Sequence, residues 1–352
     1  MTVVFLPDST EYNPYQANLA DALDEDVILG REARLLPILC IVREAEDVSV
    51  VHFHWLDPYI FRKTGPRTAA VLLLTVLQLI VIRLQGIPVV WTVHNVLSHG
   101  SRYPRLERWF KHAFVRFGFC AHAFVHCENV EDRLIEECSL PESVRQRVTV
   151  IPHGHYLDNY ENEISRDEAR LDLGYGEDES VFLFFGQIKP YKGVFHLLET
   201  FKSIDDPDYR LLVVGNPSTE SIERELRERS AGDDRIRSVL RFVPDEEIQR
   251  YMNAADAVVL PYTQVTTSGS AILVMSFGKA IIIPRMGCVP EILDEAGALI
   301  YPPEAEHGLR NALMEAKHRD LLSMGRHNTR QVRQYDWTTI AERTARVYSL
   351  TK

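Results

Sequence analysis

The sequence has 352 residues, which is longer than one ordinary domain and indicates about two. Hydrophobic residues make up 45% and charged residues 25%, the composition of a globular protein rather than a disordered or fibrous one. The formal net charge of −11 argues against broad nucleic-acid binding, which requires a basic surface. The first residues have the pattern of a strand and no basic segment, so we expect no secretory signal and a cytoplasmic location.

Short apolar runs alternate with amphipathic segments along the chain, and they form two series. The first series predicts strands at Val3–Leu6, Ser49–His54, Val89–Val93, Ala123–His126 and Val148–Ile151. The second series begins after about residue 160 and predicts strands at Val181–Phe185, Arg210–Val214, Ile236–Phe242, Ala257–Leu260 and Ala280–Ile283.

Continuous apolar strands separated by helices are typical of a parallel sheet that is covered on both faces. Two such series predict an α/β protein with two doubly wound, Rossmann-like domains. We expect a first domain at 1–160, a second at 161–332, and a C-terminal helix within 333–352 that packs back toward the first. The cleft between two such domains is the expected small-molecule site.

A nearly continuous apolar run of 14 residues, Ala69–Ile82, lies in the first half. As a helix it would be about 21 Å long, shorter than a membrane core of about 30 Å. We therefore predict a buried helix of the first domain, with partial membrane insertion as the alternative.

The surrounding segment 62–116, which begins with Arg62 and Lys63, contains nine basic residues and a single acid, Glu107. Within Tyr103–Phe117 the basic residues alternate with aromatic ones, as in helices that lie on anionic membranes. The alternative is a cleft wall that attracts nucleotide phosphates. We predict a membrane or acceptor face formed by Arg102, Arg105, Arg108, Trp109 and Lys111.

Two loops of the second half have features of anion sites. In Phe184–Gly193, a glycine follows a predicted strand and Lys192 stands where the chain enters the next helix, where a lysine can neutralise phosphate oxygens. In Leu260–Ser270, a strand is followed by a hydroxyl-rich loop and by a helix that begins near Gly269. Each has a simpler alternative, a solvated turn or a serine helix cap. Two such loops together suit a diphosphate.

Histidines and cysteines give no pattern for a metal site. His52 and His54 share one face of a strand, but no third ligand is evident, so packing is the favoured interpretation. The five cysteines form no C-x-x-C pattern. His94, at a strand end, is either structural or functional on this evidence. We expect no metal.

A set of motifs in the second half resembles the C-terminal domain of glycosyltransferase family 4. In order they are G-x-x-x-P-x-K-G (186–193), V-V-G-N-P (213–217), F-V-P-D-E-E-I (242–248), A-A-D-A-V-V-L-P-Y (254–262), S-G (268–269) and G-C-V-P-E-I (287–292). In the first half, V-V-W-T-V-H-N (89–95) and I-P-H-G (151–154) resemble the same family. The resemblance implies the GT-B fold and metal-independent, retaining sugar transfer from a nucleoside-diphosphate sugar.

The resemblance also implies roles for single residues. Lys192 would bind the donor diphosphate, Ser268 and Gly269 would offer backbone N–H groups to it, and His94 would face the donor sugar as the catalytic residue. The implied donor-binding set is Gly186, Gln187, Lys192, Gly215, Asn216, Phe242, Val243, Tyr262, Ser268, Gly269 and Glu291.

Two features depart from the family pattern. Gln187 stands where the family usually has arginine, and the stretch 265–273 has no acid where the family commonly has E-x7-E. The ribose contact is therefore unassigned.

The expected activity is transfer of a sugar, first of all mannose from GDP-mannose, to a polyprenol-linked or other glycolipid acceptor. The protein would lie peripherally on the inner face of the cell membrane, without a cofactor and without nucleic acid. Two alternatives are a GT-B sugar-nucleotide epimerase, which would need carboxylates for proton transfer, and a non-catalytic partner protein.

Overall fold

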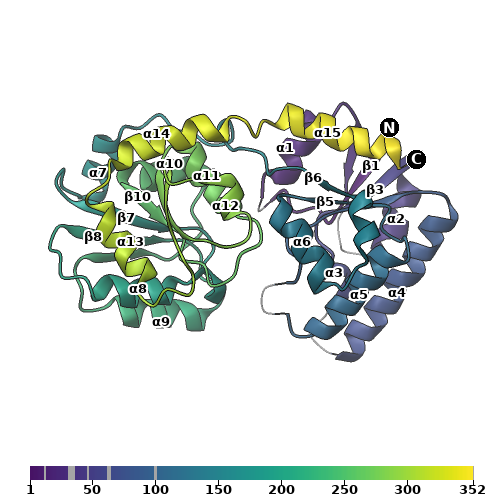
Figure 1. The fold of residues 1–352 in the computed structure, drawn as a ribbon, viewed down its shortest axis with the longest axis horizontal. Coiled ribbons are helices and arrows are strands. Elements are labelled where there is room, and N and C mark those ends of the chain that lie inside the picture. Colours follow the sequence, from purple (N-terminus) through teal and green to yellow (C-terminus); the bar gives the residue numbers. More distant parts are fainter. Residues whose placement is uncertain (12, 31–35, 46, 62–64, 99–100, 352) are drawn as a thin grey trace. The chain divides into compact units, whose positions relative to one another are not determined.

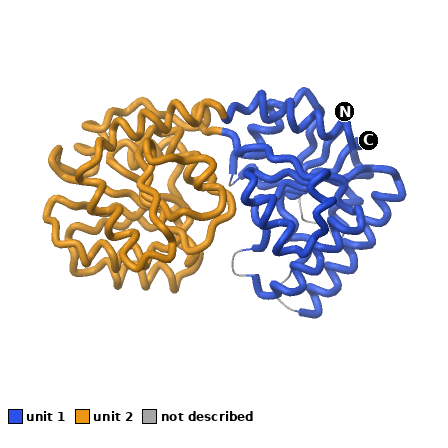
Figure 2. Tube along the Cα trace, viewed as in Figure 1, with its two compact units in different colours: residues 1–154, 335–352 blue, residues 155–334 orange. Residues whose placement is uncertain are grey.

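The structure is a computed structural model that describes residues 1–11, 13–30, 36–45, 47–61, 65–98 and 101–351. The chain forms two compact units, which Figure 2 shows in different colours. Unit 1 comprises Met1–Gly154 and Tyr335–Lys352, and unit 2 comprises His155–Gln334. The last helix of the chain is therefore part of unit 1.

Unit 1 contains a six-stranded parallel sheet in the order β2-β1-β3-β4-β5-β6 (Figure 1). Its central strands are apolar on both faces and buried, which is the reason their sequences do not alternate. The strands are β1 (Thr2–Leu6), β2 (Asp26–Leu29), β3 (Val48–Phe53), β4 (Val89–Thr92), β5 (His122–Val125) and β6 (Val148–Val150).

Helices connect these strands, and α15 returns to the sheet from the far end of the chain. Ile340, Val347 and Tyr348 of α15 pack in one core with strand residues such as Val3 and Val90. The helices are α1 (Tyr15–Ala22), α2 (Pro37–Glu44), α3 (Asp57–Ile60), α4 (Gly65–Leu84), α5 (Pro104–Arg116), α6 (Glu128–Glu137), the 3₁₀ helix η1 (Glu142–Arg147) and α15 (Trp337–Leu350).

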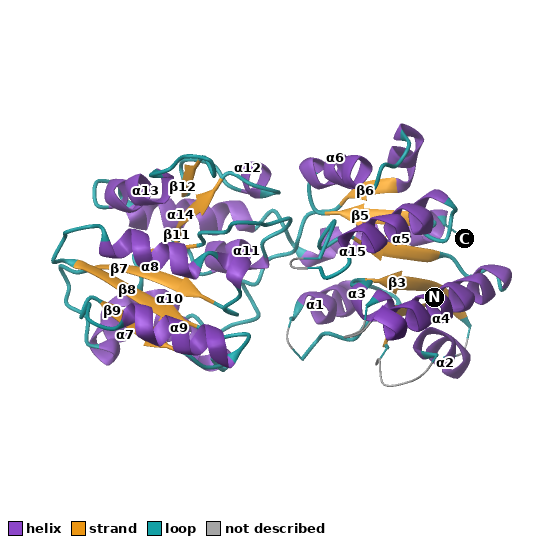
Figure 3. Cartoon of the chain, turned by 90° about the horizontal axis from the view of Figure 1, so that it is seen from below, coloured by secondary structure: helices purple, strands orange, loops and turns teal. Residues whose placement is uncertain are grey.

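Unit 2 repeats this plan with a parallel sheet in the order β12-β11-β10-β7-β8-β9. Figure 3 shows helices on both sides of it. The strands are β7 (Ser180–Phe185), β8 (Tyr209–Val214), β9 (Ile236–Val239), β10 (Ala257–Val259), β11 (Ala280–Pro284) and β12 (Ala298–Tyr301).

The first helix of unit 2 is fixed at its start and in its second half. Ser165 and Glu168 form a reciprocal capping box at its start, and Arg170 forms a 2.6 Å ion pair with Asp256, just before β10. The helices are α7 (Arg166–Leu173), η2 (Pro190–Lys192, a 3₁₀ turn), α8 (Val194–Lys202), α9 (Glu220–Ser230), α10 (Asp245–Ala254), α11 (Gly269–Ser276), α12 (Val289–Ile292), α13 (Gly308–Ala316) and α14 (Leu321–Val332).

The apolar run of unit 1 differs from its prediction in length and in burial. Helix α4 has 20 residues, so it is about 30 Å long. Thr75, Gln78, Leu79 and Ile82 are among its buried residues, while a row of large apolar side chains is exposed. The prediction of a buried helix is therefore wrong for one face. Among the described residues, α4 is the one helix long and apolar enough to cross a membrane, which is weak evidence by itself.

Candidate active site

The loops after β7 and β8 lie against each other at the carboxyl edge of the unit 2 sheet. The amide of Gly186 donates to the carbonyl of Val214 (3.0 Å), and the amide of Ile188 donates to the carbonyl of Asn216 (2.9 Å). Gly215 has φ of +154°, and a Cβ there would lie 1.8 Å from the carbonyl oxygen of Gly186. The predicted residues Gly186, Gly215 and Asn216 therefore lie next to one another.

The loop after β7 is also fixed to the loop after β10. Gly193 has φ of +74°, and a Cβ there would lie 1.8 Å from the carbonyl oxygen of Pro261. The amide of Thr263 donates to the carbonyl of Tyr191 at 2.9 Å. The two loops that the sequence singles out as anion sites are thus neighbours.

Helix α11 begins beside these loops with Ser268 as its N-cap. The Ser268 hydroxyl accepts from the amide of Ala271 (3.0 Å) and lies 3.0 Å from the Tyr262 hydroxyl. The side chain of Ser268 is therefore a helix cap, as its simpler alternative predicted. The amides of Gly269 and Ser270 belong to the first turn, where N–H groups have no carbonyl partner inside the helix.

Lys192 supplies a positive charge beside these loops. Its Nζ lies over Gly186, 3.4 Å from the position of a Cβ on that glycine. Burial, together with the neighbouring charge of Lys189, lowers the pKa of Lys192 to about 8. Among the described residues no carboxylate forms an ion pair with it. A partly buried cation without an ion-pair partner is stabilised when an anion binds beside it.

The other predicted donor residues lie on surrounding segments. The Phe242 side chain is 63% exposed in the loop after β9, where the sequence had predicted strand, and Val243 beside it is buried. Gln187 and Glu291 are exposed, the latter on α12. A contact that the sequence did not reveal joins Gly287 to Thr266, because a Cβ on Gly287 would lie 2.3 Å from the Thr266 carbonyl oxygen.

In unit 1, His94 lies two residues after β4, in a cluster of aromatic rings. Its ring stacks on Trp55 (centroids 4.4 Å apart, planes at 12°) and meets Tyr15 edge-on at 4.8 Å. Its Nε2 lies 3.5 Å from Nδ1 of His54, and its Nδ1 lies 3.3 Å from Nε2 of His126. Burial and the neighbouring histidines hold its pKa well below the usual value, so the ring is neutral near pH 7.

His126 and His153 also follow strand ends, although neither was predicted to be functional. His126 directly follows β5, and His153 lies three residues after β6, on the edge of the sheet where β4 ends. Burial lowers the pKa of His126 to about 3 and that of His153 to about 4.

The packing interpretation of His52 is confirmed. Its Nδ1 lies 2.6 Å from the Tyr348 hydroxyl and its Nε2 lies 2.7 Å from the Thr92 hydroxyl, so both nitrogens are used inside the core. Within the described ranges, no group of three or more His, Cys, Asp or Glu side chains is arranged to hold a metal ion.

Four of the five residues predicted to form a membrane or acceptor face are exposed: Arg102 lies just before α5, and the other three lie on it. Arg102, Arg105 and Arg108 are exposed, and the Trp109 side chain is 59% exposed. Arg62 and Lys63 lie outside the described residues.

The assignment of Lys111 to this face is wrong. Its ammonium is buried, forms a 2.7 Å ion pair with Glu107 one turn earlier, and donates to the carbonyl of Val96 at 2.8 Å. A buried ion pair of this kind holds α5 against the loop after β4, and it is not available to an external ligand.

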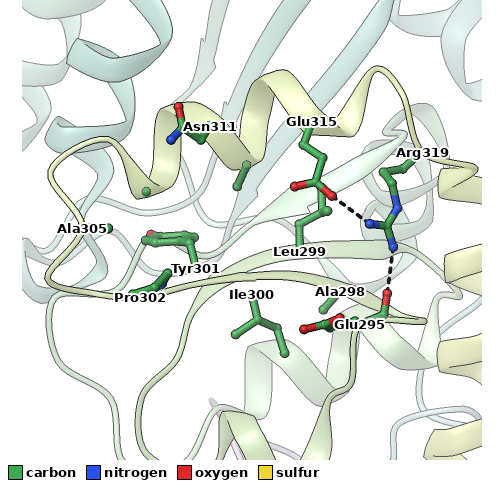
Figure 4. Close-up of a pocket in the computed structure, with 12 residues that line it drawn as sticks. Glu295, Ala298, Leu299, Ile300, Tyr301, Pro302, Ala305, Asn311, Glu315 and Arg319 are labelled. Atoms are coloured by element: carbon green, nitrogen blue, oxygen red, sulfur yellow. Dashed lines mark hydrogen bonds and ion pairs between the residues drawn. The ribbon is translucent and has the colours of Figure 1, made fainter.

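Unit 2 also contains a pocket of about 420 Å³ between β12 and α13, shown in Figure 4. Tyr301, Asn311 and the ion-paired Glu315 and Arg319 (2.7 Å) line it. None of the predicted donor residues lines this pocket.

The fold and the loops of unit 2 define a class of protein. Residues 179–317 match the model of the family described as glycosyl transferases group 1. Along its full length the structure is similar to sucrose-phosphate synthase from Thermosynechococcus elongatus (TM-score 0.76, 17% identity, covering 99% of this chain and 98% of that one). It is equally similar to Anabaena HepE in complex with UDP-glucose (TM-score 0.76, 16% identity, covering 99% of each chain). The chain has the GT-B fold and contains a glycosyl transferases group 1 domain in unit 2, so it is an enzyme that transfers a sugar.

A more specific similarity is to a GDP-mannose:glycolipid 4-beta-D-mannosyltransferase from Xanthomonas campestris pv. campestris. The two sequences are 28% identical over 99% of this chain and 92% of that protein.

Proposed function

We propose that this glycosyltransferase transfers mannose from GDP-mannose to a polyprenol-linked or other glycolipid acceptor. The observation that best supports a diphosphate donor is the position of Lys192. Its half-buried ammonium lies over Gly186, beside the start of α11. The choice of donor and acceptor is supported by the similarity to a GDP-mannose:glycolipid mannosyltransferase along nearly the whole chain.

In this proposal the leaving diphosphate is stabilised by Lys192 and by the N–H groups of Gly269 and Ser270. Fixed donors of this kind lower the barrier because they are already oriented before charge develops. His94 positions the donor sugar, and the acceptor hydroxyl attacks on the face from which the diphosphate leaves.

The proposed mechanism needs no metal, because Lys192 and helix N–H groups take the role that a divalent cation would have. Full activity in the presence of a chelator is the expected result. Loss of activity with the chelator, restored by magnesium or manganese, would contradict this part of the proposal.

Calorimetric titration of GDP-mannose into Lys192→Ala tests the donor site. A charge-assisted hydrogen bond contributes roughly 1.5–3 kcal/mol, so we expect donor affinity to fall about 10- to 100-fold. Lys202→Ala is the matched control, because Lys202 lies on α8 of the same unit and its ammonium donates to the carbonyl of Arg229. Equal affinities of wild type and Lys192→Ala would remove the diphosphate assignment.

Product analysis distinguishes the remaining alternatives. Retention predicts an α-linked mannose from an α-configured donor, which NMR of the product shows directly. A β-linked product, which the name of the Xanthomonas relative specifies for that enzyme, would overturn retention here. A new nucleotide sugar formed without acceptor would instead identify an epimerase.

We further propose that α4 and α5 dock unit 1 on an anionic membrane. The two helices run side by side: a Cβ on Gly65 would lie 3.6 Å from the Tyr103 hydroxyl, and Arg83 donates to the carbonyl of Phe117 at 2.6 Å (Figure 1). Both expose apolar side chains, and α5 adds arginines. The exposed apolar residues are Leu73, Leu77, Ile80, Leu84, Trp109 and Phe117.

Helix α4 is expected to lie in the membrane surface rather than to cross it. Its inner face is tied to unit 1 by polar contacts: Thr75 donates to the carbonyl of Tyr59 (2.7 Å), and Gln78 accepts from the amide of Ile38 (3.2 Å). Spanning would require these contacts to be broken inside hydrocarbon, which is costly.

A further inference from the structure

Three histidines of unit 1 form a row along the carboxyl edge of the sheet, after three adjacent strands. His54 follows β3, His94 follows β4 and His126 follows β5. The row ends at a backbone group, since Nδ1 of His126 lies 2.9 Å from the carbonyl oxygen of Ile151. The contacts along the row are 3.3 Å from His126 to His94 and 3.5 Å from His94 to His54.

The carbonyl of Ile151 fixes the tautomer of His126. A carbonyl oxygen only accepts hydrogen bonds, so Nδ1 of His126 carries the proton and donates. The ring is neutral, because burial holds its pKa at about 3, and its Nε2 is therefore an acceptor.

The tautomer of His126 in turn determines the tautomers of His94 and His54. Nε2 of His126 faces Nδ1 of His94, so Nδ1 of His94 carries the proton and its Nε2 holds a lone pair. Nδ1 of His54 then faces that lone pair as a donor, and two lone pairs or two N–H groups facing each other would repel. Nε2 of His54 ends the row as a buried acceptor with no partner in the described part of the chain.

We propose that His126 is a positioning residue that holds His94 as a neutral Nδ1–H tautomer with its Nε2 presented as a hydrogen-bond acceptor. Nδ1 of His54 lies 3.5 Å from the same Nε2, beyond the usual hydrogen-bond distance, so the single lone pair of Nε2 stays available to a ligand. The inference about the reaction rests on the proposed function: His94 then accepts a hydrogen bond from a hydroxyl of the sugar and does not donate one.

The row favours an acceptor over a general base. A histidine base is usually strengthened by a carboxylate behind it, which stabilises the imidazolium that forms. Here the group behind His126 is a neutral carbonyl, and the surrounding groups are uncharged rings. They come from α1 (Tyr15), from the ends of β3 and β6 (His52, His153) and from α15 (Trp337, Tyr348).

The test reads tautomers directly by long-range ¹H–¹⁵N NMR of protein labelled at its histidines. We expect His54, His94 and His126 as Nδ1–H forms, whereas the Nε2–H form predominates for a histidine side chain in water. His126→Phe removes the acceptor for His94, so we expect His94 to populate the Nε2–H form. Mannose transfer should slow about tenfold, the effect of one hydrogen bond.

Two further variants keep the proposal falsifiable if the phenylalanine disturbs packing. His126→Gln retains an acceptor near the former Nε2 and should restore most of the wild-type tautomer and rate. His122→Phe changes a partly buried histidine at the opposite end of β5, whose Nε2 bonds to Thr149 (2.8 Å), and should leave His94 unchanged.

An Nε2–H tautomer of His94 in the wild type would overturn the proposal. A slower His126→Phe with an unchanged His94 tautomer would also overturn it, because the effect would then be merely structural. The NMR experiment needs no substrate, so its result is separate from the proposed function. Absence of transfer from GDP-mannose by the wild type would count against the proposed donor alone.

Discussion

At the scale of single residues, the proposed donor site of unit 2 depends on glycines that let its loops touch. Gly193 shows this best, since its φ of +74° disfavours a side chain and the nearby carbonyl of Pro261 leaves no room for one. Gly174 has nearly the same φ, +73°, at the end of α7, but nothing lies within 4 Å of a Cβ there. Substitutions at the two positions therefore distinguish the cost of backbone strain, which both share, from the cost of displacing a neighbouring loop, which only Gly193 has.

Gly193→Ala should destabilise the protein more than Gly174→Ala. For Gly174→Ala the left-handed conformation alone costs about 1–2 kcal/mol. For Gly193→Ala the displaced carbonyl adds roughly 1–3 kcal/mol, and donor binding should fall as well. Urea unfolding and GDP-mannose calorimetry measure the two effects. Equal stability losses in both variants, with unchanged donor affinity, would show that the loops after β7 and β10 need not touch.

Lys192 predicts a pH dependence of donor binding. Because its pKa in the free protein is about 8, the ammonium is mostly charged at pH 7 and is increasingly neutral above pH 8. Only the charged form attracts the diphosphate, so affinity should decrease toward tenfold per pH unit above pH 8. Calorimetry from pH 7 to 9.5 tests this. The same decline in Lys192→Ala would assign the titration to another group.

The position of a single residue could be predicted from the sequence where the residue stands in a local motif. It could not be predicted where it depends on contacts between segments that are distant in the sequence. Lys192 and Ser268 stand in motifs whose loop context the structure reproduces. Lys111 was misplaced, although its spacing from Glu107 and Phe114 puts it on the inner face of α5. The role of His126 was not predictable, because it requires the order of β3, β4 and β5 and the position of the Ile151 carbonyl.

At the scale of elements, the internal strands were predicted within a few residues, while two edge strands were missed. β2 and β12 have four residues each and pair on one side only. Such strands have a weak pattern, and β2 begins with an acidic residue. The apolar run of α4 was recognised as a helix, but its burial on one face depends on contacts with α2 and α3 that no local pattern contains.

Helices α4 and α5 give the prediction for membrane binding. Each arginine near an anionic surface contributes about 1 kcal/mol, so replacing Arg105 and Arg108 with Ser should weaken binding to phosphatidylserine vesicles roughly 30-fold. Arg224→Ser with Arg227→Ser on α9 is the charge-matched control and should have little effect. Vesicle sedimentation measures both pairs.

The salt dependence of vesicle binding distinguishes the contribution of the arginines from that of the apolar side chains. Charge attraction decays over roughly 8 Å at physiological salt, so high salt should reproduce the arginine variant if charge dominates. Binding that persists at high salt would be due to Trp109 and the exposed leucines of α4. A wild-type protein that ignores anionic vesicles at low salt would contradict the membrane assignment.

At the scale of the whole molecule, two units of similar architecture have different surfaces. In unit 1, aromatic and histidine rings surround His94 at the carboxyl edge of the sheet. Helices α4 and α5 of the same unit expose apolar side chains and arginines, although the net charge of the protein is −11. Unit 2 has the loops that suit a diphosphate. This division was predictable because two strand series are visible in the sequence, whereas the identity of donor and acceptor is not encoded in any one motif.

The most direct test of the account is a transfer assay with GDP-mannose and a short lipid-linked saccharide in anionic vesicles. Mass spectrometry of the lipid and quantification of released GDP measure the reaction, with Lys192→Ala and Lys202→Ala run beside the wild type. The account predicts one added mannose per acceptor and equimolar GDP for the wild type and Lys202→Ala, with almost none for Lys192→Ala. GDP-mannose that is neither bound nor consumed by the wild type, or transfer that is undiminished in Lys192→Ala, would contradict it.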